Sequence, residues 1–372
     1  MSNNEQIKEM ISQNIIEEKT ILVSDDNGMG ANKISYGFGG EFYQFDFPSM
    51  YKVLERMTSD SYIIDGEIVT FSEGMLAVEN GHPTKDDEFH EMLLKKALYE
   101  VYKKTNIKVF DVVTNYSLDS LKKDGGASVL ERMSNIKTFK VKELNREEVE
   151  ITINKIDCYP ECISGGALVD LNLREEDVVF TDLGTRNMQH IRVVEGIPKY
   201  ETCIATTKGM YSLYRGVANI TKTLNEGIDD YLAVKMYLTQ TNDGKIGRID
   251  TVDEKILDYL MDVTFKEMDK CFEEMETSRF TKHVFLGGGS TMLKYFLDLK
   301  FEERTGKKPI YINNPYFATS LGLFRKGEQL YNYPKHKDAI KQEKNKKETK
   351  KTNTKKDTVR KPKTTNKEKT LR

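Results

Sequence analysis

The chain has 372 residues, of which 38% are hydrophobic, and a formal net charge of −2. This length is enough for two domains of roughly 150 residues each. The sequence holds no apolar run near the roughly 20 residues that span a bilayer, and its N-terminal MSNNEQIKEM is polar, so we expect a cytoplasmic protein without a membrane anchor. The four cysteines, at positions 158, 162, 203 and 271, are too few and too scattered for a disulfide framework or a zinc site.

Hydrophobic periodicity predicts an N-terminal helical extension over residues 1–19 and then a first domain over residues 20–171. The strands expected in this domain are 21–23, 33–36, 42–47, 62–64, 68–69, 108–114, 138–141 and 149–158. The expected helices are 89–105, which has an amphipathic pattern, and 161–171.

The pattern then restarts in a second domain, residues 172–328. The strands expected here are 177–181, 188–194, 199–203, 283–286 and 309–312. The expected helices are 210–224, 228–233, 251–275 and 292–305, and a last helix, 316–328, that we expect to pack back on the first domain. Strands that alternate with helices in this way predict an α/β fold.

Residues 329–372 have the composition of a disordered basic tail. From Lys335 onward the chain has 16 Lys or Arg and 5 Asp or Glu, a net charge of +11, which leaves −13 for the rest. A tail of this charge can bind DNA through its phosphates, bridge acidic bodies of the same protein into bundles, or serve only to keep the chain soluble. No aromatic residue follows Tyr333, so base stacking is not expected.

Two acidic, glycine-containing turns each follow an apolar strand. The first runs Asp26-Asn27-Gly28-Met29-Gly30-Ala31-Asn32-Lys33 and the second Asp182-Leu183-Gly184-Thr185-Arg186-Asn187. Glycine lets backbone N–H groups approach an anion without a Cβ in the way. An aspartate beside phosphates requires a cation between them, so Asp26 and Asp182 predict Mg²⁺ held through water, with Lys33 near the β- and γ-phosphates.

A single turn of this kind would be an ordinary Asn-Gly hairpin. The repeat of the pattern, together with a third glycine turn between a strand and a helix, favours phosphate binding instead. This third turn is Gly287-Gly288-Gly289-Ser290. It matches neither a P-loop nor a G-x-G-x-x-G motif.

Taken in order, these motifs resemble those of the actin, sugar kinase and heat-shock chaperone ATPase superfamily. Within it the sequence is similar to ParM-type bacterial actins, over roughly residues 20–328. Residues 159–166, YPECISGG, resemble the stretch whose glutamate positions the attacking water, which makes Glu161 the candidate catalytic residue. The alternative for Glu161 is an acidic residue at an ordinary helix start after Pro160.

The resemblance implies two duplicated α/β domains of the actin-like fold with a nucleotide cleft between them. It assigns phosphate contacts to Asp26, Gly28, Met29, Gly30, Ala31, Asn32, Lys33, Asp182, Gly184, Thr185, Arg186 and Asn187. It assigns nucleoside contacts to Gly287, Gly288, Gly289, Ser290, Lys222 and Asn225. The second turn reads Gly-Thr-Arg-Asn where relatives have Gly-Gly-Thr-Thr, so Arg186 is open to two interpretations, a phosphate contact or a solvent-facing side chain.

The function implied is a filament-forming protein that hydrolyses ATP or GTP with Mg²⁺ and segregates plasmid DNA. Its expected partners are further copies of itself and a DNA-binding adaptor of the ParR type on a plasmid centromere. Two alternatives stay open: a small-molecule kinase of the same superfamily, and a binding scaffold without hydrolysis. The compact length of about 310 residues for two domains favours the filament.

Overall fold

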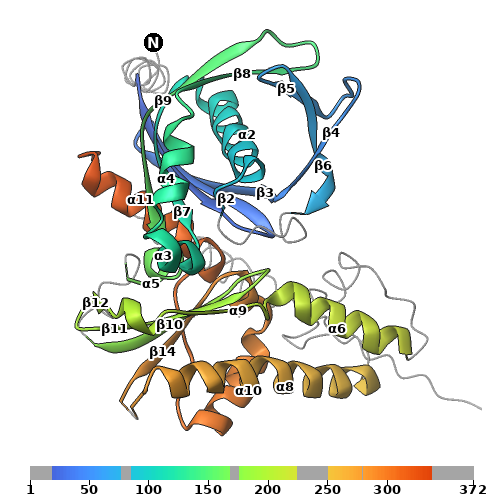
Figure 1. Ribbon diagram of the computed structural model, residues 1–372, viewed down its shortest axis with the longest axis vertical. Coiled ribbons are helices and arrows are strands. Elements are labelled where there is room, and N and C mark those ends of the chain that lie inside the picture. Colours follow the sequence, from blue (N-terminus) through green and yellow to red (C-terminus); the bar gives the residue numbers. More distant parts are fainter. Residues whose placement is uncertain (1–18, 77–84, 168–175, 224–249, 279, 337–372) are drawn as a thin grey trace, which may run out of the picture. The chain divides into compact units, whose positions relative to one another are not determined.

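The computed structural model describes residues 19–76, 85–167, 176–223, 250–278 and 280–336. The helices and strands in these ranges all lie within one compact unit, Met1–Lys335. Two separate β-sheets with associated helices form this unit (Figure 1). Within the described ranges, no helix is both long enough and apolar enough to span a bilayer. The four cysteines are free thiols.

The first sheet is nine-stranded and is built from the N-terminal half of the chain. In spatial order its strands are β3 (Glu41–Pro48), β2 (Ala31–Phe38), β1 (Ile21–Asn27), β7 (Val109–Tyr116), β9 (Val149–Pro160), β8 (Thr138–Glu143), β5 (Ser61–Ile64), β6 (Glu67–Leu76) and β4 (Met50–Val53). Strand β1 pairs antiparallel with β2 and parallel with β7, and β7 pairs parallel with β9. Two short helices, α3 (Leu118–Asp124) and α4 (Ala127–Ser134), follow β7.

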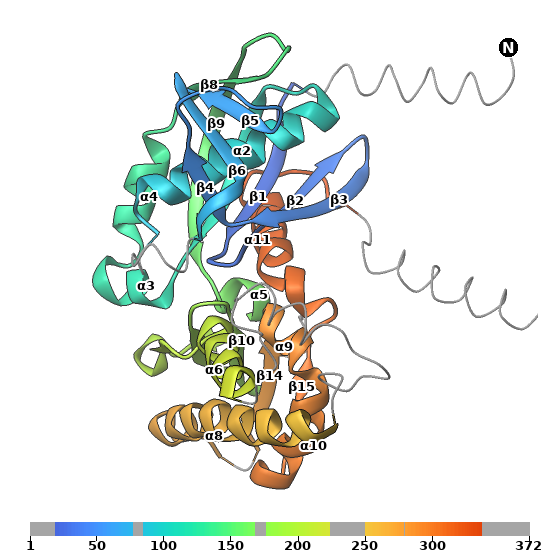
Figure 2. The same cartoon turned by 90° about the vertical axis from the view of Figure 1, so that its right-hand side faces the viewer.

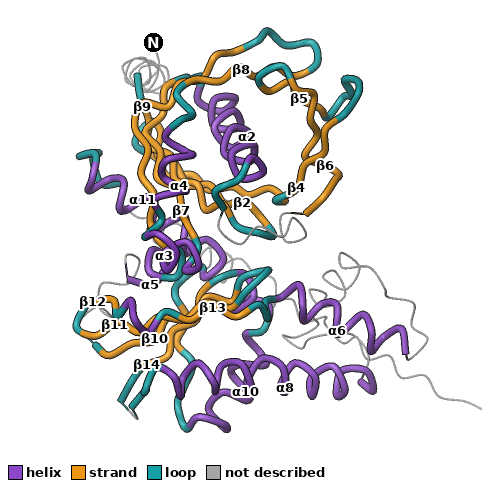
Figure 3. The backbone as a smooth tube through the Cα atoms, viewed as in Figure 1, coloured by secondary structure: helices purple, strands orange, loops and turns teal. Residues whose placement is uncertain are grey.

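Helix α2 (Glu88–Thr105) is enclosed by the strands of the first sheet, which wrap around it (Figures 1 and 3). Every residue from Met92 to Tyr99 is buried, so the amphipathic pattern predicted for this helix does not mark a solvent-facing side. Two lysines in this stretch are buried because they have partners. Lys96 Nζ donates to Tyr62 Oη and to Glu100 Oε1, both at 3.0 Å.

The last described helix, α11 (Ala318–Leu330), lies against the first sheet rather than beside its neighbours in sequence. It follows a 3-10 turn, η4 (Pro315–Phe317). Leu323 and Phe324 are fully buried and pack with Leu22 of β1 and Val113 of β7. The core beneath β1 and β7 is therefore completed by residues that lie roughly 300 positions after β1 and roughly 210 positions after β7 in the chain.

The second sheet has the spatial order β12 (Ile197–Pro198), β11 (Met188–Val194), β10 (Asp177–Leu183), β14 (Lys282–Leu286) and β15 (Ile310–Tyr311), with β13 (Ile204–Thr206) paired to β11. Its helices are α6 (Met210–Thr223), α8 (Asp250–Glu274), α9 (Gly288–Met292) and α10 (Lys294–Thr305). Figure 2 shows α8 and α10 from a second direction. Helix α5 (Ile163–Ala167) follows β9.

Both faces of the second sheet are buried, and successive residues of β10 point to opposite faces, as the period of a strand requires. Val179 packs in a cluster with Phe265 of α8 and Leu297 of α10. Phe180 packs on the other side, in a cluster that includes Cys162 beside α5. The sheet is thus a central layer between helices, which confirms the predicted α/β class.

The two sheets repeat one local arrangement. In each, a strand turns through a hairpin into an antiparallel partner and also pairs in parallel with a strand from later in the chain: β1 with β2 and β7, and β10 with β11 and β14. This repeat agrees with the predicted duplication. The predicted boundary at residues 171/172 lies outside the described residues, as do the helices predicted at 1–19 and 228–233.

The helix predicted at 292–305 is present as α10, which begins two residues later and follows the short helix α9. Two other predictions about individual elements are wrong. Residues 199–203 do not form a strand, because β12 ends at Pro198 and the chain then makes a 3-10 turn, η3 (Tyr200–Thr202). The basic tail was predicted to start at residue 329, yet α11 continues to Leu330 and the Tyr331 hydroxyl donates to Asp157 Oδ2 at 3.0 Å.

Candidate functional site

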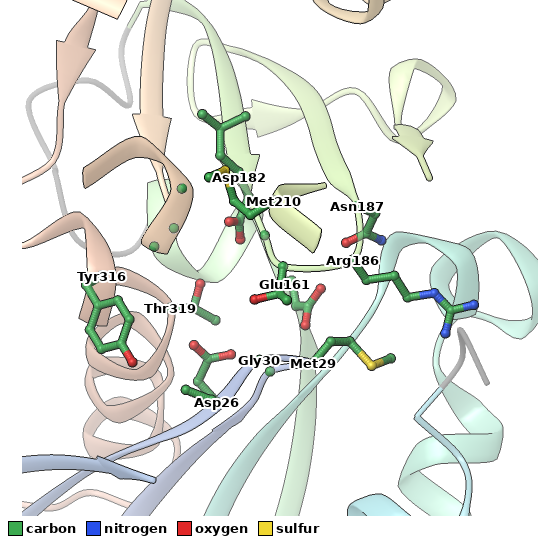
Figure 4. Close-up of a pocket in the computed structure, with 18 of the residues that line it drawn as sticks. Asp26, Met29, Gly30, Glu161, Asp182, Arg186, Asn187, Met210, Tyr316 and Thr319 are labelled. Atoms are coloured by element: carbon green, nitrogen blue, oxygen red, sulfur yellow. The ribbon is translucent and has the colours of Figure 1, made fainter. Parts of the chain in front are cut away.

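A pocket of about 300 Å³ lies where the two sheets approach each other within the compact unit. Figure 4 shows it from one side, with the Asp26, Glu161 and Asp182 carboxylates facing the same space. Four segments supply most of its lining: the β1–β2 hairpin, the β10–β11 hairpin, the turn after β14, and the start of α6. The first three of these segments contain the turns that the sequence predicts to bind the nucleotide.

The β1–β2 hairpin presents an aspartate and a lysine side by side. Asp26 and Lys33 are direct partners across the two strands, and Lys33 Nζ lies 2.7 Å from Asp26 Oδ2. Burial opposes the charge of Lys33, but the Asp26 carboxylate and the more distant Asp182 raise the pKa of Lys33 above its usual value. Lys33 is therefore a fixed positive charge on the pocket wall.

Two glycines of this hairpin have different reasons to lack a side chain. A Cβ at Gly28 would lie 2.6 Å from the carbonyl oxygen of Ala31, within the turn itself. A Cβ at Gly30 would overlap the side chain of Thr185, whose own Cβ would be 2.9 Å away. The first hairpin thus touches the second at Gly30. Met29 and Ala31 line the pocket between them.

The β10–β11 hairpin is tied to the start of α6 by its backbone. Gly184 N–H donates to the Asn187 carbonyl at 3.0 Å and closes the turn. The Gly184 carbonyl accepts from Met210 N–H at 3.0 Å, and the Thr185 carbonyl accepts from Tyr211 N–H at 2.7 Å. The tip of the hairpin is therefore held by α6, which packs against the second sheet.

Asp182 sits at the base of this hairpin and is 9% exposed. Burial, reinforced by the charges of Glu161 and Asp26, raises its pKa to about 7, while Lys33 opposes the shift. The Arg186 side chain extends away from the three carboxylates (Figure 4), although residue 186 lines the pocket. The pocket therefore concentrates carboxylates that a bound cation would stabilise in their charged form.

The turn after β14 needs glycine at its first position. Gly287 has φ 84°, in the left-handed region, and a Cβ there would overlap the Asp182 carboxylate and lie 2.9 Å from the Leu183 carbonyl. Gly288 and Gly289 line the pocket as well. This turn is thus packed against the base of the second hairpin, with bare backbone exposed to the pocket.

The Glu161 carboxylate is held on both oxygens. It is 7% exposed, at the end of β9, and its N–H donates to the Tyr116 carbonyl at 2.9 Å. Oε1 forms an ion pair with Lys85 and accepts from Asn115 Nδ2 at 3.2 Å. Oε2 accepts from Gln189 Nε2. Since Glu161 also lines the pocket, its carboxylate is both anchored and within reach of a ligand there.

Not every predicted residue faces the pocket. Asn32 is fully buried, and its amide points toward α2, where it donates to the Leu93 carbonyl at 3.4 Å. The Ser290 hydroxyl donates back to the Gly287 carbonyl at 2.8 Å, within its own turn. Neither residue is part of the pocket lining. The side chain of Lys222, and the whole of Asn225, lie outside the described residues.

Sequence reasoning missed several residues of the site. Gln189 follows the second hairpin by two positions, and the alternation of β11 was the signal that could have found it. Tyr214 of α6 and Met292 of α9 line an apolar part of the pocket, where the Tyr214 hydroxyl lies 2.7 Å from the Met292 sulfur. Tyr316 also lines the pocket, and its ring centroid lies 5.3 Å from Lys33 Nζ.

The donor set fits a magnesium ion held largely through water. Within the described residues, no three His, Cys, Asp or Glu side chains come together as direct ligands of one metal ion. Mg²⁺ in phosphate sites usually keeps several waters and uses one or two carboxylates. The Asp26 and Asp182 carboxylates, which both line the pocket, would be such ligands, and burial is the main reason that the pKa of Asp182 is raised.

The fold is that of actin-like proteins. A search of solved structures found the actin-like protein Alp7A at a TM-score of 0.67, with 18% identity over 89% of this chain and 100% of that one. Ta0583, an archaeal actin homolog solved in complex with ADP, has a TM-score of 0.64 and 16% identity over 83% of this chain and 99% of its own.

Two further solved structures have the same fold. The Alp12 filament structure matches at a TM-score of 0.60 and 15% identity, over 84% of this chain and 99% of that one. The apo psk41 ParM protein matches at a TM-score of 0.57 and 15% identity, over 84% of this chain and 98% of that one. No protein-family model and no curated protein matched the sequence. The predicted actin-like fold and the ParM-type resemblance are thus confirmed as a likeness of fold.

Proposed function

We propose that this chain binds ATP or GTP with Mg²⁺ in the pocket and hydrolyses it, and that the bound nucleotide controls assembly into filaments in the cytoplasm. The observation that carries the proposal is the meeting of two glycine-containing hairpins, each with an aspartate at its base, around a pocket that also holds an anchored carboxylate. In this arrangement the backbone N–H groups of the two hairpins can bind the negatively charged phosphates of a nucleotide from two sides.

Different residues of the pocket would bind the phosphates, the metal ion and the base. Backbone N–H groups of both hairpins and the Lys33 ammonium bind the phosphates, and Asp26 and Asp182 would hold Mg²⁺ through water. The ion would neutralise the charge on the β- and γ-phosphates. The apolar surface of Met210, Tyr214 and Met292 supports a flat base, and the bare backbone of Gly287–Gly289 lies beside it.

Glu161 orients the attacking water by accepting a hydrogen bond from it. The water oxygen forms a bond to the γ-phosphorus, and the bond from that phosphorus to the bridging oxygen breaks. The electron pair leaves on the diphosphate, and the proton lost by the water passes to Glu161. The products are a nucleoside diphosphate and inorganic phosphate.

Self-assembly is supported by the neighbours rather than by the pocket, and plasmid segregation by the resemblance of the sequence to ParM-type bacterial actins. Alp12 has been solved as a filament and psk41 ParM shares the fold. We infer that filaments of this chain move plasmid DNA through a DNA-binding adaptor of the ParR type. The basic residues from Lys335 onward, with a net charge of +11, would add a salt-sensitive contact to DNA or to the acidic filament body.

The test is phosphate release and sedimentation of the full chain with Mg²⁺ and either ATP or GTP, with filaments viewed by electron microscopy. We expect phosphate release and filaments with at least one nucleotide. Monomers with both nucleotides would overturn the filament proposal, and product transfer to a small molecule in place of water would favour a kinase. Deletion of 337–372 should reduce DNA retention or bundling at low salt while leaving phosphate release intact.

A further inference from the structure

Lys85 is a fully buried lysine immediately ahead of α2, with an exposed fraction of 2%. Its backbone has φ 61°, in the left-handed region that non-glycine residues seldom adopt. Burying an ammonium group is costly unless it is paired and hydrogen-bonded. A lysine held at such a position by a strained backbone therefore calls for an explanation in terms of what its ammonium group contacts.

The Lys85 ammonium contacts the residues behind the pocket, not the pocket itself. It forms an ion pair with Glu161 Oε1 and donates to Asn115 Oδ1 at 3.2 Å. Asn115 Nδ2 in turn donates to Asp26 Oδ1 at 2.6 Å. Lys33 lines the pocket and Lys85 does not. The direct contacts of Lys85 therefore connect it to the pocket through Glu161 and Asn115.

The hydrogen bonds to Glu161 leave little of its accepting capacity unused. A carboxylate offers about four lone-pair sites, two on each oxygen. Oε1 is used by Lys85 and Asn115, and Oε2 accepts from Gln189. Among the residues that the structure describes, the second acceptor site on Oε2 has no partner and is available to a water. Because Lys85 occupies Oε1, the water that Glu161 orients has a single direction from which to bind.

We propose that Lys85 is a positioning residue for hydrolysis, which acts by fixing Glu161 so that one acceptor site of Oε2 faces the attacking water. The proposal rests on the proposed function of this pocket. Without Lys85, Oε1 becomes available, the carboxylate can turn, and the bound water loses its fixed direction. Misplacement of a reacting group by about 1 Å costs on the order of 100-fold in rate.

The experiment compares Lys85→Gln, Lys85→Arg and Lys33→Gln in the full chain, by steady-state phosphate release and by nucleotide affinity. Lys85→Gln should lower kcat by about 10- to 100-fold with KM and affinity little changed, and Lys85→Arg should recover part of the loss because it restores the charge. Lys33→Gln should instead raise KM. Lys123→Gln, an exposed lysine paired with Asp86 at 3.1 Å, is the matched control and should behave as wild type.

The decisive measurement is a double-mutant cycle with Glu161→Gln. If Lys85 acts through Glu161, the double variant should be no slower than Glu161→Gln alone. Losses that multiply, a rise in KM in place of a fall in kcat, or full activity of Lys85→Gln would each overturn the proposal. Failure of the proposed function looks different: wild type releases no phosphate, or Glu161→Gln is fully active. If Lys85→Gln does not fold, Lys85→Arg in the same cycle gives the answer.

Discussion

Gly30 of the first hairpin lies directly against the side chain of Thr185 of the second hairpin. The contact is close enough that no Cβ fits at position 30 while Thr185 keeps its place. The distance between the two hairpins is therefore set by the absence of one methyl group. If both hairpins bind one chain of phosphates, that distance decides whether they can do so together.

Gly30→Ala should push the hairpins apart. The free energy of nucleotide binding should then change more than the free energy of unfolding. Overpacking of this kind typically costs about 1–3 kcal/mol, which corresponds to roughly 5- to 150-fold in affinity if it falls on the bound state. Nucleotide affinity and thermal unfolding are the measurements. Thr185→Ala in the same chain should recover part of the affinity, and a double variant as weak as Gly30→Ala would argue against the contact as the cause.

Glu161→Gln should slow phosphate release by about 100-fold or more while nucleotide binding and assembly persist, in the range for one positioned acid–base group. The amide has the same size but no longer takes up a proton. Single-turnover phosphate release and sedimentation check this. Glu148→Gln, at a side chain 51% exposed, serves as the control. Near-normal phosphate release from Glu161→Gln would remove Glu161 from the mechanism.

Asp182→Asn should weaken nucleotide binding in the presence of Mg²⁺ by about 10- to 100-fold, the range for residues that support a metal ion. Binding in the presence of a chelator should change much less, because the carboxylate acts through the cation. The control is Asp177→Asn, at the opposite end of the same strand from Asp182. This substitution breaks an ion pair with Arg192, in which Arg192 Nε lies 2.9 Å from Asp177 Oδ1. An unchanged response to Mg²⁺ in Asp182→Asn would count against this role.

Two buried histidines predict a contribution to stability that is lost in mild acid. Burial lowers the pKa of His190 to about 3 and that of His283 to about 4, and Lys307 adds to the effect at His283. Both rings touch Phe272. Below pH 6.5 both histidines bind protons in the unfolded chain but not in the folded chain, so their contribution to stability is full above about pH 6.5 and falls as pH drops toward 4. Burial raises the pKa of the Asp25 and Asp182 carboxyls to about 7, and this contributes in the opposite direction over the same range.

Each histidine should lower the free energy of unfolding by about 1.6 kcal/mol between pH 6.5 and 5. Urea unfolding of wild type and His190→Gln at several pH values isolates the contribution of His190. His190→Gln should lower stability at neutral pH, because it disturbs packing, and should also change the slope of stability against pH by the amount that His190 contributes. A slope identical to that of wild type would show that His190 is not responsible for it.

The local motifs of the site were predictable because each lies within one short segment. Asp26, Gly28 and Lys33 belong to one hairpin, so their spacing alone places them together. The same reasoning assigned Asn32 to the phosphates, although strand register pairs Asn32 with Asn27 and turns both away from Asp26 and Lys33. Attention to the two-residue period of strands would have separated these faces.

Lys85 was not predictable from its neighbours in sequence. It stands in a polar stretch, Thr84-Lys85-Asp86-Asp87, that has the composition of a solvent-exposed turn. Its role depends on Glu161, 76 positions later, and on the backbone conformation that brings the two together. The enclosure of α2 was missed for a related reason: no local pattern shows that a sheet will wrap around a helix on every side.

The position of α11 on β1 and β7 has a consequence for synthesis. Leu22 and Val113 are synthesised and leave the ribosome long before Leu323 and Phe324. The first sheet therefore emerges with one apolar face uncovered. Exposed surface of this kind makes a partly made chain prone to aggregation. We therefore expect nascent chains that stop before Ala318 to depend on chaperones, and the first sheet to become stable only once α11 has packed on it.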